Sequence, residues 1–384
     1  MRHNPLLDRL PRYPIAELQD RRQALEATGQ TVVDLSTGDP NEATAPAIRE
    51  AFAAAVPAVS DYPSIAGTPA FRSAVARYLE RRFGVAIDPD TQVLPTSGSK
   101  EAVFHLPLAA IDPSATDRAV VYPSPGYPAW GRGAAFAGGE PVPIPLDDRG
   151  TWAPWALPDD LLARTRMLYV CSPHNPSGAV LTADQLAAAW RRCRAHDVLL
   201  VSDECYVDLY EGEPPASLLQ VADEGHLVVH SLSKRSGMTG YRSGFLAGDP
   251  AVVARVRRLR ENLGVAPSAM TLAAATAAWS DDDHVAERRA LFTAKRRLLG
   301  AVIDRLGLRT TGRSAGLYLW IRLPEGWDDV RYVEHLLSHG VLLNPGSFLG
   351  EHGRGWVRAA LVPPVDALPD VAATWERAHR SFAG

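Results

Sequence analysis

Residues 226–245 read HLVVHSLSKRSGMTGYRSGF. The stretch opens with an apolar run typical of a buried strand, and Lys234 follows directly after it. Burial at such a strand end removes part of the hydration of an ammonium group, which lowers its pKa and makes the neutral amine available as a nucleophile. The common alternative is a loop lysine in solvent, because lysine is seldom buried. The hydroxyl groups and arginines around Lys234 could bind an anion beside it.

Strand-like runs lie on both sides of this stretch and alternate with helical patterns. RAVVYPSP (118–125), MLYVCSP (167–173), VLLVSDE (198–204) and RSGFLAGD (242–249) read as strands, and DQLAAAWRRCRAH (184–196) reads as a helix. Nearly continuous apolar runs fit a sheet that is buried on both faces. Strands separated by helices predict a mostly parallel α/β sheet.

The last hundred residues change in character. A charged helical region over 282–306 precedes GLYLWIRLP (316–324), which has the alternating pattern of a strand. Because 384 residues exceed what one compact core usually holds, we expect more than one domain. The expected parts are an N-terminal arm that belongs partly to the small domain (1–45), a large domain (46–275) and a small α+β domain (276–384).

The composition excludes several classes of protein. Apolar residues make up 46% and charged residues 22% of the chain, as in an ordinary globular protein, and the net charge of −4 shows no nucleic-acid footprint. The three cysteines form no CxxC pair, so we expect neither a metal site nor a disulfide framework, and a reducing cytoplasm fits best. Residues 1–14 do not read as a signal peptide, and no apolar run is long enough for a membrane span.

Two strand ends have residues that could bind a phosphate or a ligand oxygen. In PTSGSKEAVF (95–104) a strand leads into a helix start, where the backbone N–H groups of Gly98, Ser99 and Lys100 would point outward. This geometry suits a phosphate, although an ordinary turn is the commoner reason for glycine and serine there. In CSPHNPSG (171–178), Asn175 either belongs to a plain loop or is fixed toward a ligand oxygen.

A carboxylate marks another strand end, in VSDECY (201–206), where Asp203 precedes Tyr206. A buried carboxylate is costly unless a cation pairs with it, and a helix cap or a salt bridge is the ordinary alternative. In doubly wound sheets, ligands bind beyond the carboxyl ends of the strands. A nucleophilic lysine, a phosphate cradle, a carboxylate and an asparagine–tyrosine pair are together what a pyridoxal phosphate site requires.

The order of GSK, PGYP, NPSG, SDECY and SLSK, with Arg242 eight residues after the lysine, resembles the class I/II aminotransferases of fold-type I. The resemblance covers nearly the whole chain, from TGDP (37–40) to WVRAAL (356–361). It implies a large domain with a mostly parallel seven-stranded sheet flanked by helices, a smaller α+β domain, and pyridoxal 5'-phosphate as the cofactor.

The resemblance also implies a role for each matching residue. Lys234 matches the Schiff-base lysine, which also moves the proton between the substrate Cα and the cofactor, and Asp203 matches the partner of the pyridinium nitrogen. Asn175 and Tyr206 match the pair that binds the phenolate oxygen and lowers the pKa of the internal aldimine. Tyr127 matches the aromatic residue that stacks on the ring. The residues that match the phosphate-binding set are Gly98, Ser99, Lys100, Ser231 and Arg242.

Three more matches concern the substrate and the neighbouring subunit. Arg358 matches the arginine that takes the substrate α-carboxylate in a bidentate grip; the ordinary alternative is a surface arginine on an edge strand. Gly38 matches the N-terminal loop that closes over the substrate. Tyr62 matches the tyrosine that reaches the phosphate of the neighbouring subunit, which implies an obligate homodimer with shared active sites.

The substrate is the open part of the resemblance. SLSKRS followed by GYRSGFLAGDP looks like the lysine-biosynthesis aminotransferases that act on N-succinyl-L,L-diaminopimelate with glutamate and 2-oxoglutarate. Those usually have an asparagine after SKRS, whereas Gly237 and Met238 follow here. Arg235 or Arg132 could meet a distal carboxylate, or could form a structural ion pair, which we favour for Arg132. Alternatives are an aminotransferase for aspartate, aromatic amino acids or L,L-diaminopimelate, and a carbon–sulfur lyase or a decarboxylase on the same fold.

Two competing interpretations have less support. Ser231 and Lys234 fit the S-x-x-K pattern of serine acyl-transferring enzymes, but the KTG and SDN elements of those enzymes do not occur, and here the pattern follows a strand. A ligand-sensing regulator on an aminotransferase fold would have an N-terminal DNA-binding module, and we expect none here.

Overall fold

The computed structural model describes residues 3–9 and 15–382. A short helix, α1 (Pro5–Arg9), precedes α2 (Ile15–Ala27). Residues 1–14, which do not read as a signal peptide, lie partly outside the described residues. Among those that are described, no helix is long and apolar enough to cross a membrane.

A seven-stranded sheet forms the centre of the larger part of the molecule. Its strands run parallel except for β8, which pairs antiparallel with both of its neighbours. In sheet order the strands are β2 (Val93–Thr96), β8 (Gly244–Gly248), β7 (His226–Ser231), β6 (Leu199–Asp203), β5 (Thr165–Cys171), β3 (Ala119–Ser124) and β4 (Glu140–Pro145). This confirms the predicted α/β class and the mostly parallel seven-stranded sheet.

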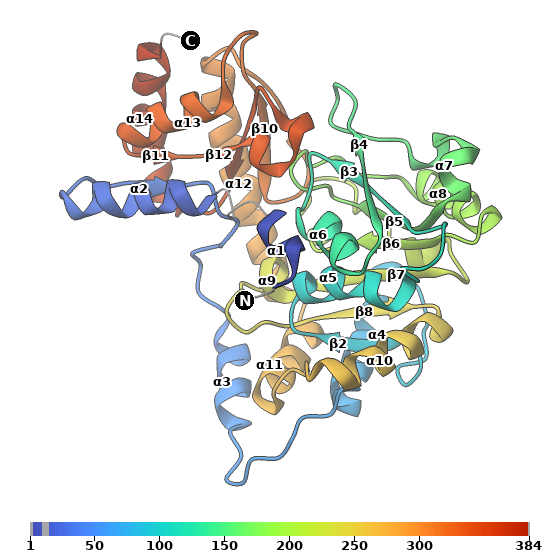
Figure 1. The fold of residues 1–384 in the computed structure, drawn as a ribbon. Helices are drawn as coiled ribbons and strands as arrows, with labels where there is room; N and C mark the ends of the chain where they lie inside the picture. The colour runs from blue at the N-terminus through green and yellow to red at the C-terminus, as the bar shows by residue number, and fades with distance from the viewer. Residues whose placement is uncertain (1–2, 10–14, 383–384) are drawn as a thin grey trace.

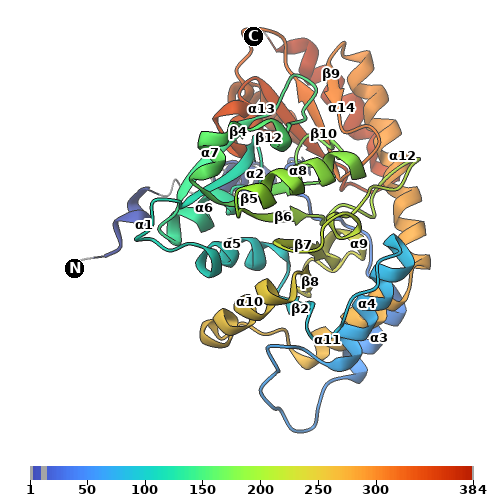
Figure 2. The ribbon, with the colours of Figure 1, turned by 90° about the vertical axis from the view of Figure 1, so that its right-hand side faces the viewer.

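Helices cover both faces of this sheet, as the nearly continuous apolar strands require (Figures 1 and 2). On β7, for example, Val228 belongs to one hydrophobic cluster, while Leu227 and Val229 belong to the cluster on the other face. The first cluster, which we call the first core, includes residues of α3 (Pro46–Ala54), α4 (Pro69–Phe83), α7 (Asp159–Ala163), α8 (Ala183–Ala195) and α11 (Ala269–Ser280). The opposite face is covered by α5 (Ser99–Ala110), α6 (Ala129–Phe136) and α10 (Pro250–Leu263).

A separate hydrophobic cluster, the second core, forms the smaller part of the molecule, at the top of Figure 1. It joins Leu18 and Leu35 of the N-terminal arm to residues of the last hundred positions. An antiparallel sheet runs in the order β12 (Asn344–Pro345), β13 (Trp356–Ala360), β10 (Tyr318–Arg322), β9 (Arg309–Thr311), and β1 (Val33–Asp34) pairs parallel with β11 (Val341–Leu342). The helices of this part are α12 (Asp283–Arg305), α13 (Asp329–Ser338) and α14 (Leu368–Ser381).

The second boundary between the expected parts falls inside a helix. Position 275/276 lies within α11, and Ala278 and Trp279 of that helix belong to the first core. We therefore propose that the large domain extends to Ser280 and that the small domain begins with α12.

Candidate active site

A cavity of about 280 Å³ lies where the carboxyl ends of β5, β6 and β7 meet the second core. Parallel strands end at one edge of a sheet, which is why motifs far apart in the sequence meet here. The predicted site residues that line it are Gly38, Ser99, Tyr127, Asn175, Asp203, Tyr206, Ser231, Lys234, Arg242 and Arg358.

Lys234 lies directly beyond the buried strand β7, in a four-residue helix, α9 (Leu232–Arg235). The S-x-x-K pattern therefore follows a strand, as expected, and it also opens a short helix. Ser231 begins the helix, and its side chain accepts a hydrogen bond from the backbone N–H of Ser233 at 3.1 Å. The Lys234 ammonium donates to the backbone oxygen of Gly38. Burial lowers the pKa of Lys234, which favours the neutral, nucleophilic amine.

Asp203 ends β6 and is only 4% exposed. The backbone N–H of Cys205 donates to its Oδ1 at 3.3 Å, but no cation within residues 3–9 and 15–382 forms an ion pair with it. Burial raises the pKa of Asp203 above its ordinary value. A buried carboxylate that faces a cavity without a cation fits a ligand that supplies the positive charge, such as a protonated ring nitrogen.

Arg358 reaches the cavity from β13 in the second core and is 7% exposed, so the alternative of a surface arginine is wrong. It donates from Nη1 to Oδ1 of Asn175 at 3.0 Å and from Nη2 to the backbone oxygen of Ser36 at 2.7 Å. With its amide turned, Asn344 accepts from the same Nη2 at 2.9 Å. Among the residues that the structure describes, Arg358 has no carboxylate partner and its Nε has no acceptor. A buried guanidinium in this state fits a carboxylate ligand.

The N-terminus of α5 and Arg242 lie together at another wall of the cavity. Gly98 has φ +81° and precedes the first helical residue, Ser99. A Cβ atom at Gly98 would overlap the guanidinium of Arg242, so only glycine allows this close approach. Arg242 is held by the backbone oxygens of Thr239 (2.9 Å) and Ser97 (3.3 Å). A helix N-terminus beside an arginine fits a phosphate group.

Comparison with known proteins agrees with this geometry. Residues 30–367 match the sequence profile of aminotransferase class I and II. The chain belongs to this family. It is 33% identical over 372 residues to an LL-diaminopimelate aminotransferase of Aquifex aeolicus, covering 94% of this chain and 95% of that one. It is 36% identical over 375 residues to the 4-dedimethylamino-4-oxo-anhydrotetracycline transaminase OxyQ of Streptomyces rimosus, covering 95% and 98%.

Solved structures of aminotransferases have the same fold. One from Neisseria meningitidis superposes with a TM-score of 0.89 at 31% identity, over 98% of this chain and all of the other. A probable N-succinyldiaminopimelate aminotransferase from Thermus thermophilus gives a TM-score of 0.90 at 28% identity, over 95% and 99%. The protein is therefore an aminotransferase, and like its family it uses pyridoxal phosphate.

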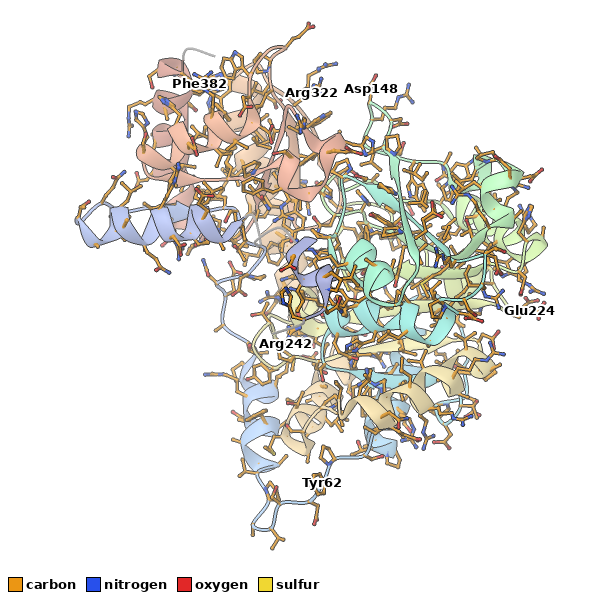
Figure 3. The ribbon with its side chains drawn as sticks, viewed as in Figure 1. Tyr62, Asp148, Glu224, Arg242, Arg322 and Phe382 are labelled. Atoms are coloured by element: carbon orange, nitrogen blue, oxygen red, sulfur yellow. The ribbon has the colours of Figure 1, made fainter. Side chains whose placement is uncertain are left out.

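Three predicted cofactor residues of the aminotransferase do not line its cavity: Tyr62, Lys100 and Gly98, the last of which lies against Arg242. Tyr62 is fully exposed on the loop between α3 and α4, and Figure 3 shows it at the far end of this loop, well away from Arg242. A role toward a neighbouring subunit therefore stays a prediction. Lys100 is exposed and does not line the cavity, so only its backbone N–H, in the first turn of α5, suits the expected role.

Neither arginine considered for a distal carboxylate lines the cavity of the aminotransferase. Arg235 is 3% exposed and donates from Nε to Asp208 at 2.9 Å and from Nη2 to Asp282 at 2.7 Å. Its guanidinium also lies over the rings of Tyr78 and Trp279. The structure thus supports the ion-pair interpretation of Arg235. Arg132 lies half-buried on α6.

Several lining residues were not anticipated from the sequence. Tyr318 contacts two predicted site residues: its hydroxyl lies 3.3 Å from that of Tyr206, and the Arg358 guanidinium lies 4.2 Å from its ring centre. No motif marked Tyr318, although the alternating strand pattern over 316–324 could have shown which face it shares with Trp320. The other unanticipated lining residues are Ile15, Ser36, Thr37, Pro128, Trp130, Cys171, Cys205, Ser233, Asn344, Phe348 and Leu349.

Proposed function

We propose that this aminotransferase moves the amino group of an L-amino acid, with glutamate as the expected donor, to a 2-oxo acid. The observation that carries the proposal is the pair of Lys234 and Arg358 in one cavity. One supplies an amine of lowered pKa, and the other supplies a buried guanidinium that pairs with no carboxylate of residues 3–9 and 15–382. An α-amino acid has the complementary carboxylate next to the carbon at which the proton must move.

The residues present fit pyridoxal phosphate, which supplies an electron sink when bound. We assign Asp203 to the ring nitrogen, Asn175 and Tyr206 to the ring oxygen, and Tyr127 to the ring face. Lys234 would bind the cofactor and move the proton at the substrate Cα. The residues assigned to the phosphate are Gly98, Ser99, Ser231 and Arg242, together with the backbone of Lys100.

For the substrate we propose N-succinyl-L,L-diaminopimelate with 2-oxoglutarate as its partner, in lysine biosynthesis. The lysine motif and the likeness to the Thermus thermophilus protein support it. L,L-diaminopimelate itself is the second candidate, because several relatives at 32–35% identity are named LL-diaminopimelate aminotransferases. Ile15, Phe348 and Leu349 are apolar residues that line the cavity and are available to contact the methylene chain of either compound.

We propose a homodimer and a cytoplasmic location as well. The loop that bears Tyr62 also exposes Val56 (62%) and Val59 (75%), and large apolar side chains gathered on one exposed loop favour a protein contact. The three cysteines are buried free thiols, as is usual in a reducing compartment. Light scattering of the purified protein would give its mass in solution, and a monomer would contradict the dimer.

A panel of half-reactions tests the proposal. The cofactor-loaded enzyme is mixed with one amino acid at a time, and loss of the visible absorption band is followed. We expect N-succinyl-L,L-diaminopimelate, L,L-diaminopimelate and glutamate to react, and aspartate serves as the comparison for a shorter side chain. If no amino acid changes the band, the transfer reaction is wrong. If pyruvate or ammonia appears without an acceptor, the enzyme is a lyase.

A further inference from the structure

Tyr318 occupies a junction that none of the assigned roles explains. It is 5% exposed, lies at the start of β10 and belongs to the second core. A Cβ atom at Gly38 would overlap its hydroxyl, so the N-terminal arm closes tightly against it. The backbone oxygen of Gly38 in turn accepts the hydrogen bond of Lys234. One phenol side chain therefore touches both the arm that holds the lysine and the second core.

The ring of Tyr318 lies against the guanidinium of Arg358. Tyr318 and Arg358 are diagonal neighbours across antiparallel strands, because Arg358 pairs with Trp320, two residues farther along β10. The guanidinium carbon lies 4.2 Å from the ring centre, within the range of a cation–π interaction. Since no carboxylate of the described chain holds Arg358, this ring and the acceptors on Ser36, Asn175 and the turned Asn344 fix its plane.

The hydroxyl of Tyr318 contacts the hydroxyl of Tyr206 and bears on where the Tyr206 proton points. Arg358 is always a donor, so Asn175 must accept with Oδ1, and its Nδ2 is thereby turned to donate to the Tyr206 hydroxyl at 3.4 Å. If Tyr318 donates to the same oxygen across 3.3 Å, both lone pairs of Tyr206 are used. The proton of Tyr206 is then left to point into the cavity.

We propose that Tyr318 is a positioning residue with two separable tasks: its ring orients Arg358 for the substrate carboxylate, and its hydroxyl turns the Tyr206 proton toward the cofactor ring oxygen. The inference rests on the proposed function. The charged and titratable groups that face Tyr318 and Tyr206 are Arg358, Lys234, Cys171 and Cys205.

Two substitutions separate the tasks, since Tyr318→Phe removes the hydroxyl and keeps the ring, whereas Tyr318→Leu removes both. A donor to the ring oxygen withdraws charge from it and lowers the pKa of the nitrogen that joins Lys234 to the cofactor. We expect Tyr318→Phe to raise the midpoint of the pH titration of the visible band by roughly 0.3 to 1 unit, the effect of one hydrogen bond. The inhibition constant of the deaminated analogue of the best donor should stay within about twofold, because the cation–π contact remains.

Tyr318→Leu should shift the titration in the same way and also raise that inhibition constant by roughly 3- to 30-fold. If this variant does not fold, Tyr318→Met serves in its place. Tyr332→Phe is the matched control, because Tyr332 is a fully buried tyrosine of the second core whose hydroxyl bonds His379 (2.9 Å) and Trp375 (3.0 Å) outside the cavity. It should lower the melting temperature without moving either readout.

Each outcome decides one task. An unchanged titration midpoint in Tyr318→Phe overturns the hydroxyl task, and unchanged analogue binding in Tyr318→Leu or Tyr318→Met overturns the ring task. If Tyr332→Phe changed the titration midpoint or the inhibition constant by the same amount, both readouts would only report a general loss of stability, and the proposal would be overturned. If the wild-type enzyme binds the cofactor but no amino acid changes its band, the proposed function fails instead.

Discussion

Replacing Arg358 by glutamine should abolish most activity while leaving the fold about as stable as before. Two charge-assisted hydrogen bonds to a substrate carboxylate, at about 1.5–3 kcal/mol each, amount to about 3–6 kcal/mol. At 1.36 kcal/mol per factor of ten, kcat/KM should fall roughly 10²- to 10⁴-fold. Arg358→Lys keeps the charge but loses the planar, bidentate guanidinium, so its kcat/KM should lie between those of the wild type and Arg358→Gln.

The stability of the Arg358→Gln variant follows from the same contacts. The variant loses hydrogen bonds to Ser36, Asn175 and the turned Asn344, at about 0.5–1.5 kcal/mol each. It also removes a 93%-buried charge (7% exposed) that no carboxylate of the described residues compensates, and this desolvation cost offsets the loss. We expect the free energy of unfolding of the cofactor-free protein to change by about 1 kcal/mol or less.

The assay is a double cycle of enzyme and substrate. The wild type and Arg358→Gln are each given the best amino acid and the amine that lacks its α-carboxylate, and the rate of the half-reaction is measured. If Arg358 binds the carboxylate, the wild type should react more slowly with the amine than with the acid. This factor should be about as large as the one by which Arg358→Gln slows the reaction with the acid. The variant should react with the acid and the amine at nearly equal rates. Arg296→Gln is the control, because Arg296 is 2% exposed on α12 and bonds the backbone oxygen of Gly316 at 2.6 Å outside the cavity. A variant that slows the acid and the amine equally would refute the carboxylate role.

Three further substitutions test the remaining assignments. Lys234→Ala should lose turnover and the visible band of the lysine-bound cofactor; turnover at the wild-type rate would show that another group acts. Asp203→Asn should bind the cofactor more weakly and transfer more slowly. Since the pKa of Asp203 is raised above its unfolded value, the charged carboxylate opposes folding as pH rises, so the cofactor-free variant should melt higher than wild type at neutral pH, as calorimetry would show. Tyr62→Ala should weaken cofactor binding with little effect on the melting temperature of the cofactor-free protein, because the side chain is fully exposed within its own chain; equal cofactor affinity would contradict its shared role.

The sequence could predict those parts of the site that depend on local chain order. Asp203 ends a buried strand, Lys234 and Asn175 come shortly after one, and parallel strands bring their carboxyl ends to one edge. Tyr318 was not predictable in this way, because it depends on how the second core packs against the large sheet. Asn344 was not predictable for a different reason, since its contact with Arg358 requires the antiparallel pairing of β12 and β13 within the second core.

The departure from the lysine motif also has a structural explanation. Gly237 has φ +65°, the left-handed region that glycine and asparagine adopt most readily, so exchanging one for the other keeps the backbone. A Cβ atom there would lie 2.8 Å from Nη1 of Arg288, so in this chain the guanidinium takes the space that a side chain would need. Met238 is fully buried in the first core. Neither residue lines the cavity, so substrate choice should depend on Ile15 and Phe348, which do, and not on the residues beside the lysine.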